Sequence, residues 1–399
     1  MPKDLSARAI LDRLVAFPTV SRDSNLALVD WVEGYLRGHG VAAERVWSAD
    51  RRKAHLFAQV GPEVAGGVML SGHTDVVPVD GQAWSSDPWR LVERGGRMHG
   101  RGTCDMKGFL ALALAAVPQA QAAGLKRPLQ LALSYDEEVG CVAVVAMIEA
   151  MAGRLPPPGA VIVGEPSGMK VVTGHKGGTG YAVELRGHEV HSSLLHRGVS
   201  AVMEAARLID WANRQNAESA ARVPAAAAAD FDPPWTSVHV GRVRGGTAGN
   251  ITAGCCRFEI EFRVVPGERV EDWEAAFEAE VARVEAGMQA VHPDCRIVLE
   301  KYYALPPLQP EGLGAGLGDC AVPASGAAEA LARRLTGDNG RHVVSYGTEG
   351  GQFQRRGFST VICGPGDIAQ AHQPDEYLTR AQFAAGERFL NRLVHSLTE

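Results

Sequence analysis

Three adjacent carboxylates, Asp136, Glu137 and Glu138, directly follow the apolar run Leu129–Tyr135. Carboxylates this crowded repel one another and are costly to remove from water. An acidic stretch is commonly a solvated loop, and the triplet alone permits that interpretation. The alternative is chemical: a divalent cation would neutralise one glutamate while its neighbour moved protons. Which interpretation holds depends on whether the rest of the chain supplies further ligands.

Further side chains of metal-ligand type also lie beside apolar runs. His73 and Asp75 follow such a run in VMLSGHTDVVP, and Glu165 follows another in AVIVGEPS. Asp105 precedes a strongly apolar segment that starts at residue 107, and His372 lies in the Gly/Pro-flanked loop GPGDIAQAHQPDEY. Each has an ordinary alternative, since single residues of these types also serve as structural histidines, helix caps or loop acids.

The convergence of these residues favours a metal site. In open parallel sheets, ligands bind beyond the carboxyl ends of the strands. Two histidines and three carboxylates at such ends match a two-metal site with mixed nitrogen and oxygen ligands, which suits Zn²⁺ and also Co²⁺ or Mn²⁺. Asp75 is spaced to hold the spare ring nitrogen of His73 and so to fix its tautomer.

Alternating helices and strands position these residues. Hydrophobic periodicity predicts helices at 4–17, 25–38, 107–123 and 140–151, and strands at 55–60, 68–71, 129–135 and 160–163. The strands are apolar throughout, which is typical of a mostly parallel sheet covered on both faces.

The pattern changes near Gly177. Strand 179–187, helix 198–216, strands 236–243 and 255–264, helix 270–287 and strand 295–302 follow the β-α-β-β-α-β order of a ferredoxin-like unit. After residue 304 the α/β pattern returns, with helices at 325–336 and 379–396 and strands at 342–345 and 359–363. We therefore predict the α/β class: a phosphorylase/hydrolase-like catalytic domain, residues 1–177 and 304–399, interrupted by an α+β domain at 178–303.

Composition excludes several kinds of function. The formal net charge of −6 and the absence of a Lys/Arg stripe argue against nucleic-acid binding. No apolar run reaches the roughly 18 residues of a membrane span. The N-terminal stretch lacks the apolar core of a signal peptide, which predicts a cytoplasmic protein. The seven irregularly spaced cysteines are expected to be reduced thiols, and a GxxxxGK[ST] phosphate loop is absent.

The motifs SGHTDVVP, GRGTCDMKG, DEEVG, GEPS and AHQPDEY resemble, in the same order, those of the dinuclear zinc deacylases and exopeptidases. That family includes acetylornithine deacetylase, succinyl-diaminopimelate desuccinylase, the aminoacylases and the glutamate carboxypeptidases. The resemblance extends over nearly the whole chain. It implies two divalent metal ions per subunit, Zn²⁺ with Co²⁺ as a substitute, and a small-molecule N-acyl amino acid as substrate.

The resemblance also implies a role for each motif residue. His73 and Glu165 would complete one metal site, Glu138 and His372 the other, and Asp105 would bridge them. Glu137 would act as the general base on a metal-bridging water, which two ions ~3.5–4 Å apart can activate. The ions would also polarise the acyl carbonyl and stabilise the oxyanion.

Four further residues gain implied roles in the α+β domain and the substrate pocket. In GHEVHSS, His191 would reach the active site of a partner subunit, which makes the α+β domain a lid and dimerisation domain and the enzyme a homodimer. In GGTAGN, Asn250 would donate to substrate or oxyanion, and in FEIEFR, Arg263 would clamp a substrate carboxylate. Glu349, in YGTEGGQF, would pair with a cationic side chain or would instead only order its loop.

HKG, GEPS, YGTEGGQF and GPGDIAQAHQPDEY together resemble acetylornithine deacetylase most. This implies hydrolysis of N²-acetyl-L-ornithine to L-ornithine and acetate, a step of arginine biosynthesis. Ser167 and Gly350 depart from the Thr and Ala that are common at these places, which leaves an aminoacylase or a metallo-exopeptidase with another preference as the alternative. A non-catalytic ligand-binding relative is the alternative from a different class, and metal analysis with chelation separates it from an enzyme.

Overall fold

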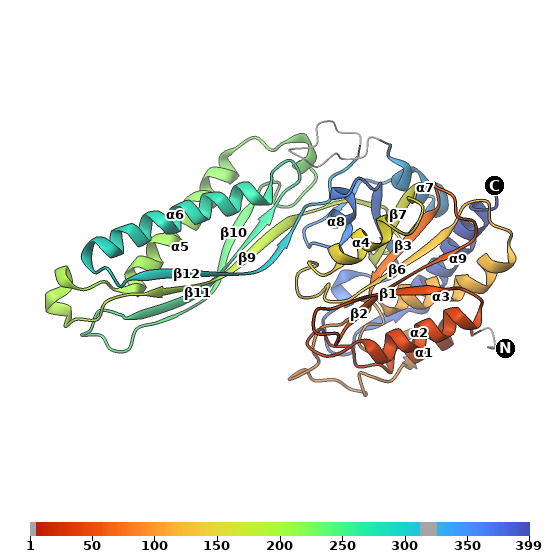
Figure 1. Ribbon diagram of the computed structural model, residues 1–399, viewed down its shortest axis with the longest axis horizontal. Coiled ribbons are helices and arrows are strands. Elements are labelled where there is room, and N and C mark those ends of the chain that lie inside the picture. Colours follow the sequence, from red (N-terminus) through yellow and green to blue (C-terminus); the bar gives the residue numbers. More distant parts are fainter. Residues whose placement is uncertain (1–4, 312–324) are drawn as a thin grey trace.

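The computed structural model describes residues 5–311 and 325–399, which form a large and a small domain (Figure 1). We use "small domain" for the continuous stretch Gly177–Leu305, which extends away from the rest. The large domain consists of the described segments before and after it. Residue 4 of the first predicted helix, and residues 312–324 of the second large-domain segment, lie outside the described residues.

An eight-stranded sheet forms the centre of the large domain, in the order β1-β2-β6-β3-β7-β14-β8-β13. Its strands are β1 (Ala43–Trp47), β2 (Ala54–Val60), β3 (Val68–His73), β6 (Leu129–Ser134), β7 (Ala160–Pro166), β8 (Val172–His175), β13 (His342–Val344) and β14 (Thr360–Gly364). Strands β6, β3, β7 and β14 run parallel to one another and are buried along their whole length. The prediction of a mostly parallel, doubly covered sheet is confirmed.

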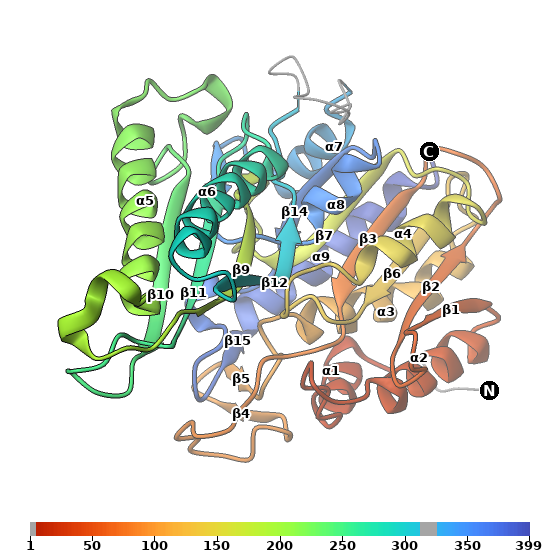
Figure 2. The ribbon, with the colours of Figure 1, turned by 60° about the vertical axis from the view of Figure 1, so that its left-hand side comes forward.

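Helices cover both faces of this sheet (Figure 2). On one face, a single hydrophobic cluster joins α1 (Ala7–Val15), α2 (Leu26–Gly38), α3 (Lys107–Ala122), α7 (Ala327–Thr336) and α9 (Arg380–Ser396). On the other face, α4 (Val144–Ala152) and α8 (Gly350–Arg355) pack in a second cluster. The sequence pattern predicted all of these helices except α8, which spans only six residues.

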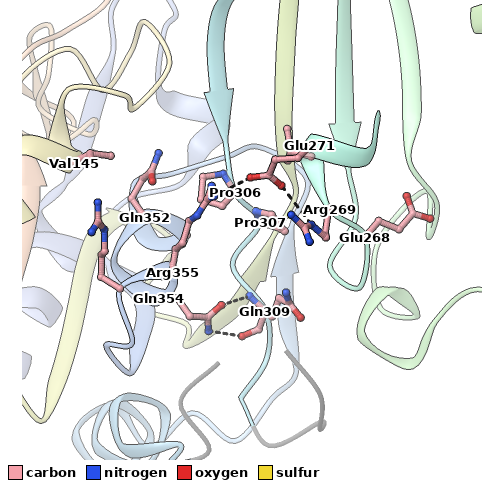
Figure 3. A pocket seen from close by; sticks show the side chains of 13 residues that line it. Val145, Glu268, Arg269, Glu271, Pro306, Pro307, Gln309, Gln352, Gln354 and Arg355 are labelled. Carbon is pink, nitrogen blue, oxygen red and sulfur yellow. Dashed lines mark hydrogen bonds and ion pairs between the residues drawn. The ribbon is translucent and has the colours of Figure 1, made fainter. Parts of the chain in front are cut away.

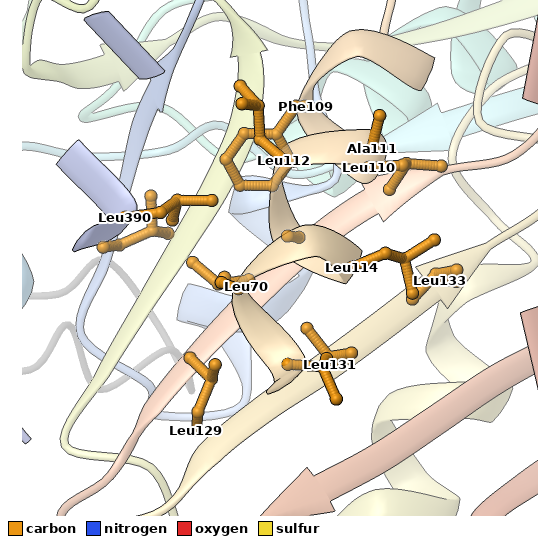
Figure 4. Packing of buried hydrophobic residues seen from close by; sticks show 14 of the residues in the cluster. Leu70, Phe109, Leu110, Ala111, Leu112, Leu114, Leu129, Leu131, Leu133 and Leu390 are labelled. Atoms are coloured by element: carbon orange, nitrogen blue, oxygen red, sulfur yellow. The ribbon is translucent and has the colours of Figure 1, made fainter. Parts of the chain in front are cut away.

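Helix α3 is the most deeply buried of the helices around the sheet. Figure 4 shows it lying between leucines of β3 and β6, such as Leu131, and Leu390 of α9. A Cβ atom at Gly164 of β7 would lie 2.0 Å from the ring of Phe109, so this glycine allows α3 to approach the sheet. Because Asp105 lies just before α3, this packing holds it at the edge of the sheet.

A small three-stranded sheet joins two distant parts of the chain. It consists of β4 (Val92–Arg94), β5 (Arg97–His99) and β15 (Tyr377–Thr379), in the order β15-β5-β4. Strands β5 and β15 are antiparallel, with Tyr377 opposite His99. The pairing brings the segment after β5, which carries Asp105, next to the segment before β15, which carries His372.

The small domain has its own sheet and core. Its elements are β9 (Gly177–Arg186), α5 (Ala201–Ala221), β10 (Ser237–Gly245), β11 (Cys255–Val264), α6 (Val270–Val291) and β12 (Arg296–Leu305). The strands are antiparallel in the order β10-β11-β9-β12, and alternate residues of β11 are buried against the two helices. This is the predicted ferredoxin-like unit, and the predicted fold class is confirmed.

Candidate metal centre

The carboxyl ends of neighbouring parallel strands bring ligand-type side chains to one edge of the large sheet. Strand β3 ends at His73, which is paired with Ser134, the last residue of β6. Glu138 follows β6, and Glu165 lies near the end of β7, on the other side of β3. The loop after β14 carries His372. This is the edge at which open α/β sheets bind their ligands.

Asp105 lies between the two histidines. Its Oδ1 is 3.0 Å from Nε2 of His73, and its Oδ2 is 3.2 Å from Nε2 of His372. His73 is fully buried, whereas the His372 side chain is 46% exposed. One carboxylate therefore reaches both histidines through different oxygen atoms, an arrangement that suits a ligand shared by two ions.

Each histidine has a second carboxylate beside it. Oε1 of Glu165 lies 3.6 Å from Nε2 of His73, and Oε2 of Glu138 lies 3.0 Å from Nε2 of His372. The structure thus brings together all five predicted metal ligands, as two pairs that share Asp105.

The donor atoms of this cluster fit divalent cations. Oε1 of Glu138 and Oε1 of Glu165 are buried and lack a hydrogen-bond partner among the described residues. Burial, and then the charge of Asp105, raises the pKa of Glu138 to about 7 and the pKa of Glu165 well above its ordinary value. Carboxylates in this setting retain protons unless a positive charge compensates them. The mixture of imidazole nitrogen and carboxylate oxygen is one that Zn²⁺ and related ions accept.

Glu137 lies against the same cluster. Its carboxylate, His73 and Glu165 each offer one ligand atom within 4.8 Å of the others. The thiol of Cys141 lies 3.0 Å from Oε1 of Glu137 and donates to it, while burial raises the pKa of Glu137 to about 8. The carboxylate is close enough to the cluster for proton transfer, and these distances would also permit it to be a ligand.

Asp75 shapes the acidic loop as well as His73. Its carboxylate accepts hydrogen bonds from the hydroxyl of Ser21 at 2.7 Å and from the backbone N–H groups of Glu137 and Glu138 at 3.3 and 3.4 Å. Nδ1 of His73 lies 2.8 Å from the main-chain oxygen of Asp75 and 3.6 Å from its carboxylate. The spare ring nitrogen is therefore held first by the main chain, and the carboxylate instead orders the loop of the two glutamates.

Asp136 has a structural role that the sequence did not reveal. Its Oδ1 lies 2.6 Å from Nζ of Lys53, and its φ of 58° places it in the left-handed region. The ion pair anchors the start of the acidic loop. Because Lys53 is far away in the sequence and lies in no motif, no local pattern indicated it.

His191 and Asn250 meet at the far tip of the small domain. The N–H of Ser192 donates to the main-chain oxygen of Asn250 at 2.9 Å, and His191 is bridged to Ile251. Strand β9, which leads to this tip, has ten residues and spans about 33 Å at roughly 3.3 Å per residue. Figure 1 shows the tip extending away from the large domain. Within one chain, the structure therefore does not bring these two residues to the metal cluster.

Comparisons with known proteins agree with this geometry. The profile of Peptidase family M20/M25/M40 matches residues 69–396. A protein of Myxococcus xanthus named acetylornithine deacetylase is 36% identical, over 97% of this chain and 96% of its own length. The chain belongs to peptidase family M20/M25/M40. A protein of Pasteurella multocida, also named acetylornithine deacetylase, is 30% identical over 99% of this chain and 98% of its own.

Two solved structures share the fold. An M20 family metallo-carboxypeptidase from Sulfolobus solfataricus matches with a TM-score of 0.75 at 16% identity, over the full length of both chains. Human carnosine dipeptidase 1 matches with a TM-score of 0.68 at 18% identity, over 98% of this chain and 96% of its own. Together with the sequence relatives, the family match confirms the predicted resemblance, and the chain is a metal-dependent amidohydrolase.

Two further predicted residues of this M20/M25/M40 chain, Arg263 and Glu349, are not members of the candidate metal-binding groups. Arg263 lies on β11 opposite Gly178, near the junction of the domains, with Nη2 3.1 Å from a carboxylate oxygen of Glu261. Glu349 is fully buried and accepts the hydroxyl hydrogens of Ser71, at 2.5 Å, and Ser134, at 2.7 Å. Its contacts differ from those expected of a residue that binds a substrate side chain, and they support the alternative, an ordering role within the sheet.

A cavity of about 430 Å³ lies at the domain junction of this M20/M25/M40 member (Figure 3). Pro306, Gln352 and Arg355 are among the residues that line it, and the predicted metal ligands are not. Arg355 forms an ion pair with Glu271 of α6 at 2.9 Å, which joins the two domains. No helix in the described part of the chain is long and apolar enough to cross a membrane, and the six cysteines there carry free thiols.

Proposed function

We propose that this enzyme hydrolyses N²-acetyl-L-ornithine to L-ornithine and acetate. The observation that carries the chemistry is the position of Asp105, whose two oxygens face His73 and His372 inside a cluster of buried carboxylates. The substrate is supported by the two named relatives, which are similar to this chain over nearly its whole length. Such a reaction belongs to arginine biosynthesis, and we propose a cytoplasmic location for it.

In this proposal the cluster holds two divalent ions, with Zn²⁺ as the physiological choice. His73 and Glu165 would hold one ion, Glu138 and His372 the other, and Asp105 would contact both. When bound, the ions supply Lewis-acid polarisation of the amide carbonyl and lower the pKa of the attacking water.

Glu137 moves the proton in the proposed reaction. It accepts a proton from the water as the water oxygen attacks the acyl carbon, and then donates it to the amide nitrogen as the carbon–nitrogen bond breaks. Cys141 holds one carboxylate oxygen of Glu137, and Asp75 fixes the backbone of Glu137, so the base keeps its orientation. The products are acetate and the ammonium form of the amine, whose nitrogen has taken up both hydrogens of the water.

We further propose that the active unit is a homodimer. Because His191 and Asn250 lie at the far tip of the small domain, they would complete the site of the partner subunit, where they would donate to the substrate or the oxyanion. Arg263, nearer the domain junction, would bind the α-carboxylate of the substrate with its guanidinium group. The donors His191 and Asn250 would stabilise the negative charge that develops on the acyl oxygen.

A substrate panel with defined metal loading tests the proposal. We expect N²-acetyl-L-ornithine to give a higher kcat/KM than N-acetylmethionine or a dipeptide, and we expect a chelator to abolish the activity. Preference for N-acetylmethionine would favour an aminoacylase. Preference for the dipeptide would favour an exopeptidase, and the two structural neighbours are named as peptidases. Activity that is indifferent to the chelator would contradict the metal-dependent mechanism itself.

A further inference from the structure

Glu376 is a carboxylate that is buried close to the metal cluster, shortly after His372. Glu376 is only 1% exposed to solvent. Oε2 lies 2.8 Å from Nη1 of Arg101, whose side chain is also 1% exposed. Burial makes an ion pair of this kind costly, and further hydrogen bonds to the carboxylate offset part of that cost, although Nε of Arg101 has no hydrogen-bond partner among the described residues.

Those further hydrogen bonds come from the segment that leads to Asp105. Glu376 accepts the backbone N–H groups of Gly102 at 3.0 Å, Cys104 at 2.8 Å and Asp105 at 3.1 Å. The chain after β5 therefore wraps around one carboxylate, which fixes the backbone at the residue that reaches both histidines. Hydrogen bonds to a charged acceptor are stronger than those between neutral groups, so this arrangement is rigid.

Arg101 connects the same carboxylate to the loop of His372. Its guanidinium group also donates to the side-chain oxygen of Gln82. The amide nitrogen of Gln82 in turn donates to the main-chain oxygen of His372 at 2.9 Å. The pairing of β5 with β15 anchors the other side of this loop.

We propose that Glu376, held by Arg101, is a positioning residue that sets the spacing between Asp105 and His372. The inference rests on the proposed two-ion function and goes beyond the ligand set. It predicts an unequal effect on the two ions. Asp105 would serve both ions, but the ion beside His372 also depends on the His372 loop, which Glu376 holds through Arg101 and Gln82. The other ligands of the second ion, His73 and Glu165, lie on neighbouring strands of the central sheet.

Titration of metal-free protein with Co²⁺ tests this inequality. In the Glu376→Gln variant, an amide group replaces the carboxylate that accepts the backbone N–H groups and the Arg101 guanidinium in the wild type. We expect the affinity of one site to be weakened about 10–100-fold, the range for outer-sphere partners of metal ligands, and the affinity of the other site to be weakened less. The weakened site should be the one that His372→Ala removes. The control is Glu387→Gln, an exposed carboxylate on α9, which should leave both affinities unchanged. Unchanged affinity at both sites of Glu376→Gln, or equal weakening of both, would overturn the proposal.

Hydrogen exchange provides a readout without metal. Metal-free Glu376→Gln should exchange its amides at residues 102–105 faster than wild type, with the central strands unchanged. The double variant Arg101→Met/Glu376→Gln removes both members of the ion pair, so neither is left as an unpaired charge. It keeps the test open if the single variant folds poorly, and it should show the same local change. Unchanged exchange at residues 102–105 would overturn the positioning role. A wild-type protein that binds no Co²⁺ would refute the proposed function, while the exchange result would still decide the role of Glu376.

Discussion

Removal of metal should make the stability of this protein fall as the pH rises. The pKa of Glu138, whose side chain is 6% exposed, is raised by burial and by the charge of Asp105 from an ordinary 4.5 to about 7. The folded state therefore binds a proton more tightly than the unfolded chain does. The stability that this proton provides is present below pH 4.5 and is lost as the pH rises through 7.

The magnitude follows from the two pKa values. The difference between 7 and 4.5, at about 1.4 kcal/mol per pKa unit, corresponds to a loss of roughly 3–4 kcal/mol from Glu138, of which about 3 kcal/mol falls above pH 5. His372 acts in the same direction, because hydrogen bonds to Asp105 and Glu138 raise its pKa from 6.5 to about 10. Its contribution is present below pH 6.5 and is lost as the pH rises through 10. Bound metal replaces these protons, so metal should stabilise the protein more at higher pH.

Urea unfolding of chelator-treated protein at about pH 5 and pH 8.5 measures this effect. We expect the free energy of unfolding to be lower at the higher pH, and the decrease to be smaller by about 3 kcal/mol in Glu138→Gln. Reloading with Zn²⁺ should restore more stability at pH 8.5 than at pH 5. The pKa values of the buried His55 and His175 are lowered to about 4, so these groups act in the opposite direction, and the comparison with Glu138→Gln isolates the carboxylate. If Glu138→Gln lost as much stability as the wild type between the two pH values, the reasoning about buried, crowded carboxylates would be refuted.

Three further substitutions test other parts of the structure. Glu137→Ala should retain both metal ions, measured by elemental analysis, but lose at least about a hundredfold in kcat; loss of metal would instead make Glu137 a ligand. His191→Ala and Glu137→Ala should each be nearly inactive. When equal amounts of the two variants are unfolded, mixed and refolded together, about a quarter of wild-type activity should return, because half of the dimers then contain one intact site. No recovery would contradict the shared site. Gly164→Ala should destabilise the protein to urea by about 1–3 kcal/mol, because the new Cβ would overlap the ring of Phe109; a neutral effect would show that α3 can shift.

The fold was predictable where local periodicity and packing agree. The strands that lead to His73 and Glu165 are apolar throughout because both faces of the sheet are covered, and that pattern is visible in the sequence. Elements of six residues or fewer are too short to establish a period, and the helices and strands that the sequence pattern missed are all of this kind. They are β1, β4, β5, β8 and β15, with at most five residues each, and α8, with six.

The candidate ligands were predictable because each follows a recognisable apolar run or lies in a distinctive motif. Their supporting contacts were not. Lys53 pairs with Asp136, and Arg101 pairs with Glu376, across long sequence separations that no local pattern encodes. Glu349 shows a different limit. The motif left open whether this acid pairs with a substrate side chain or only orders its loop, and the tertiary structure buries it between two serine hydroxyls.

Strand β14 has a consequence for how the protein is made. It lies between β7 and β8 in the sheet, although it is synthesised after both of them and after the whole small domain. Until residues 360–364 leave the ribosome, β7 presents an open edge that is largely apolar, which is a hazard for aggregation. His372 emerges later still. A chain whose translation stopped before β14 would therefore lack a central strand of its sheet, between β7 and β8, and would also lack His372.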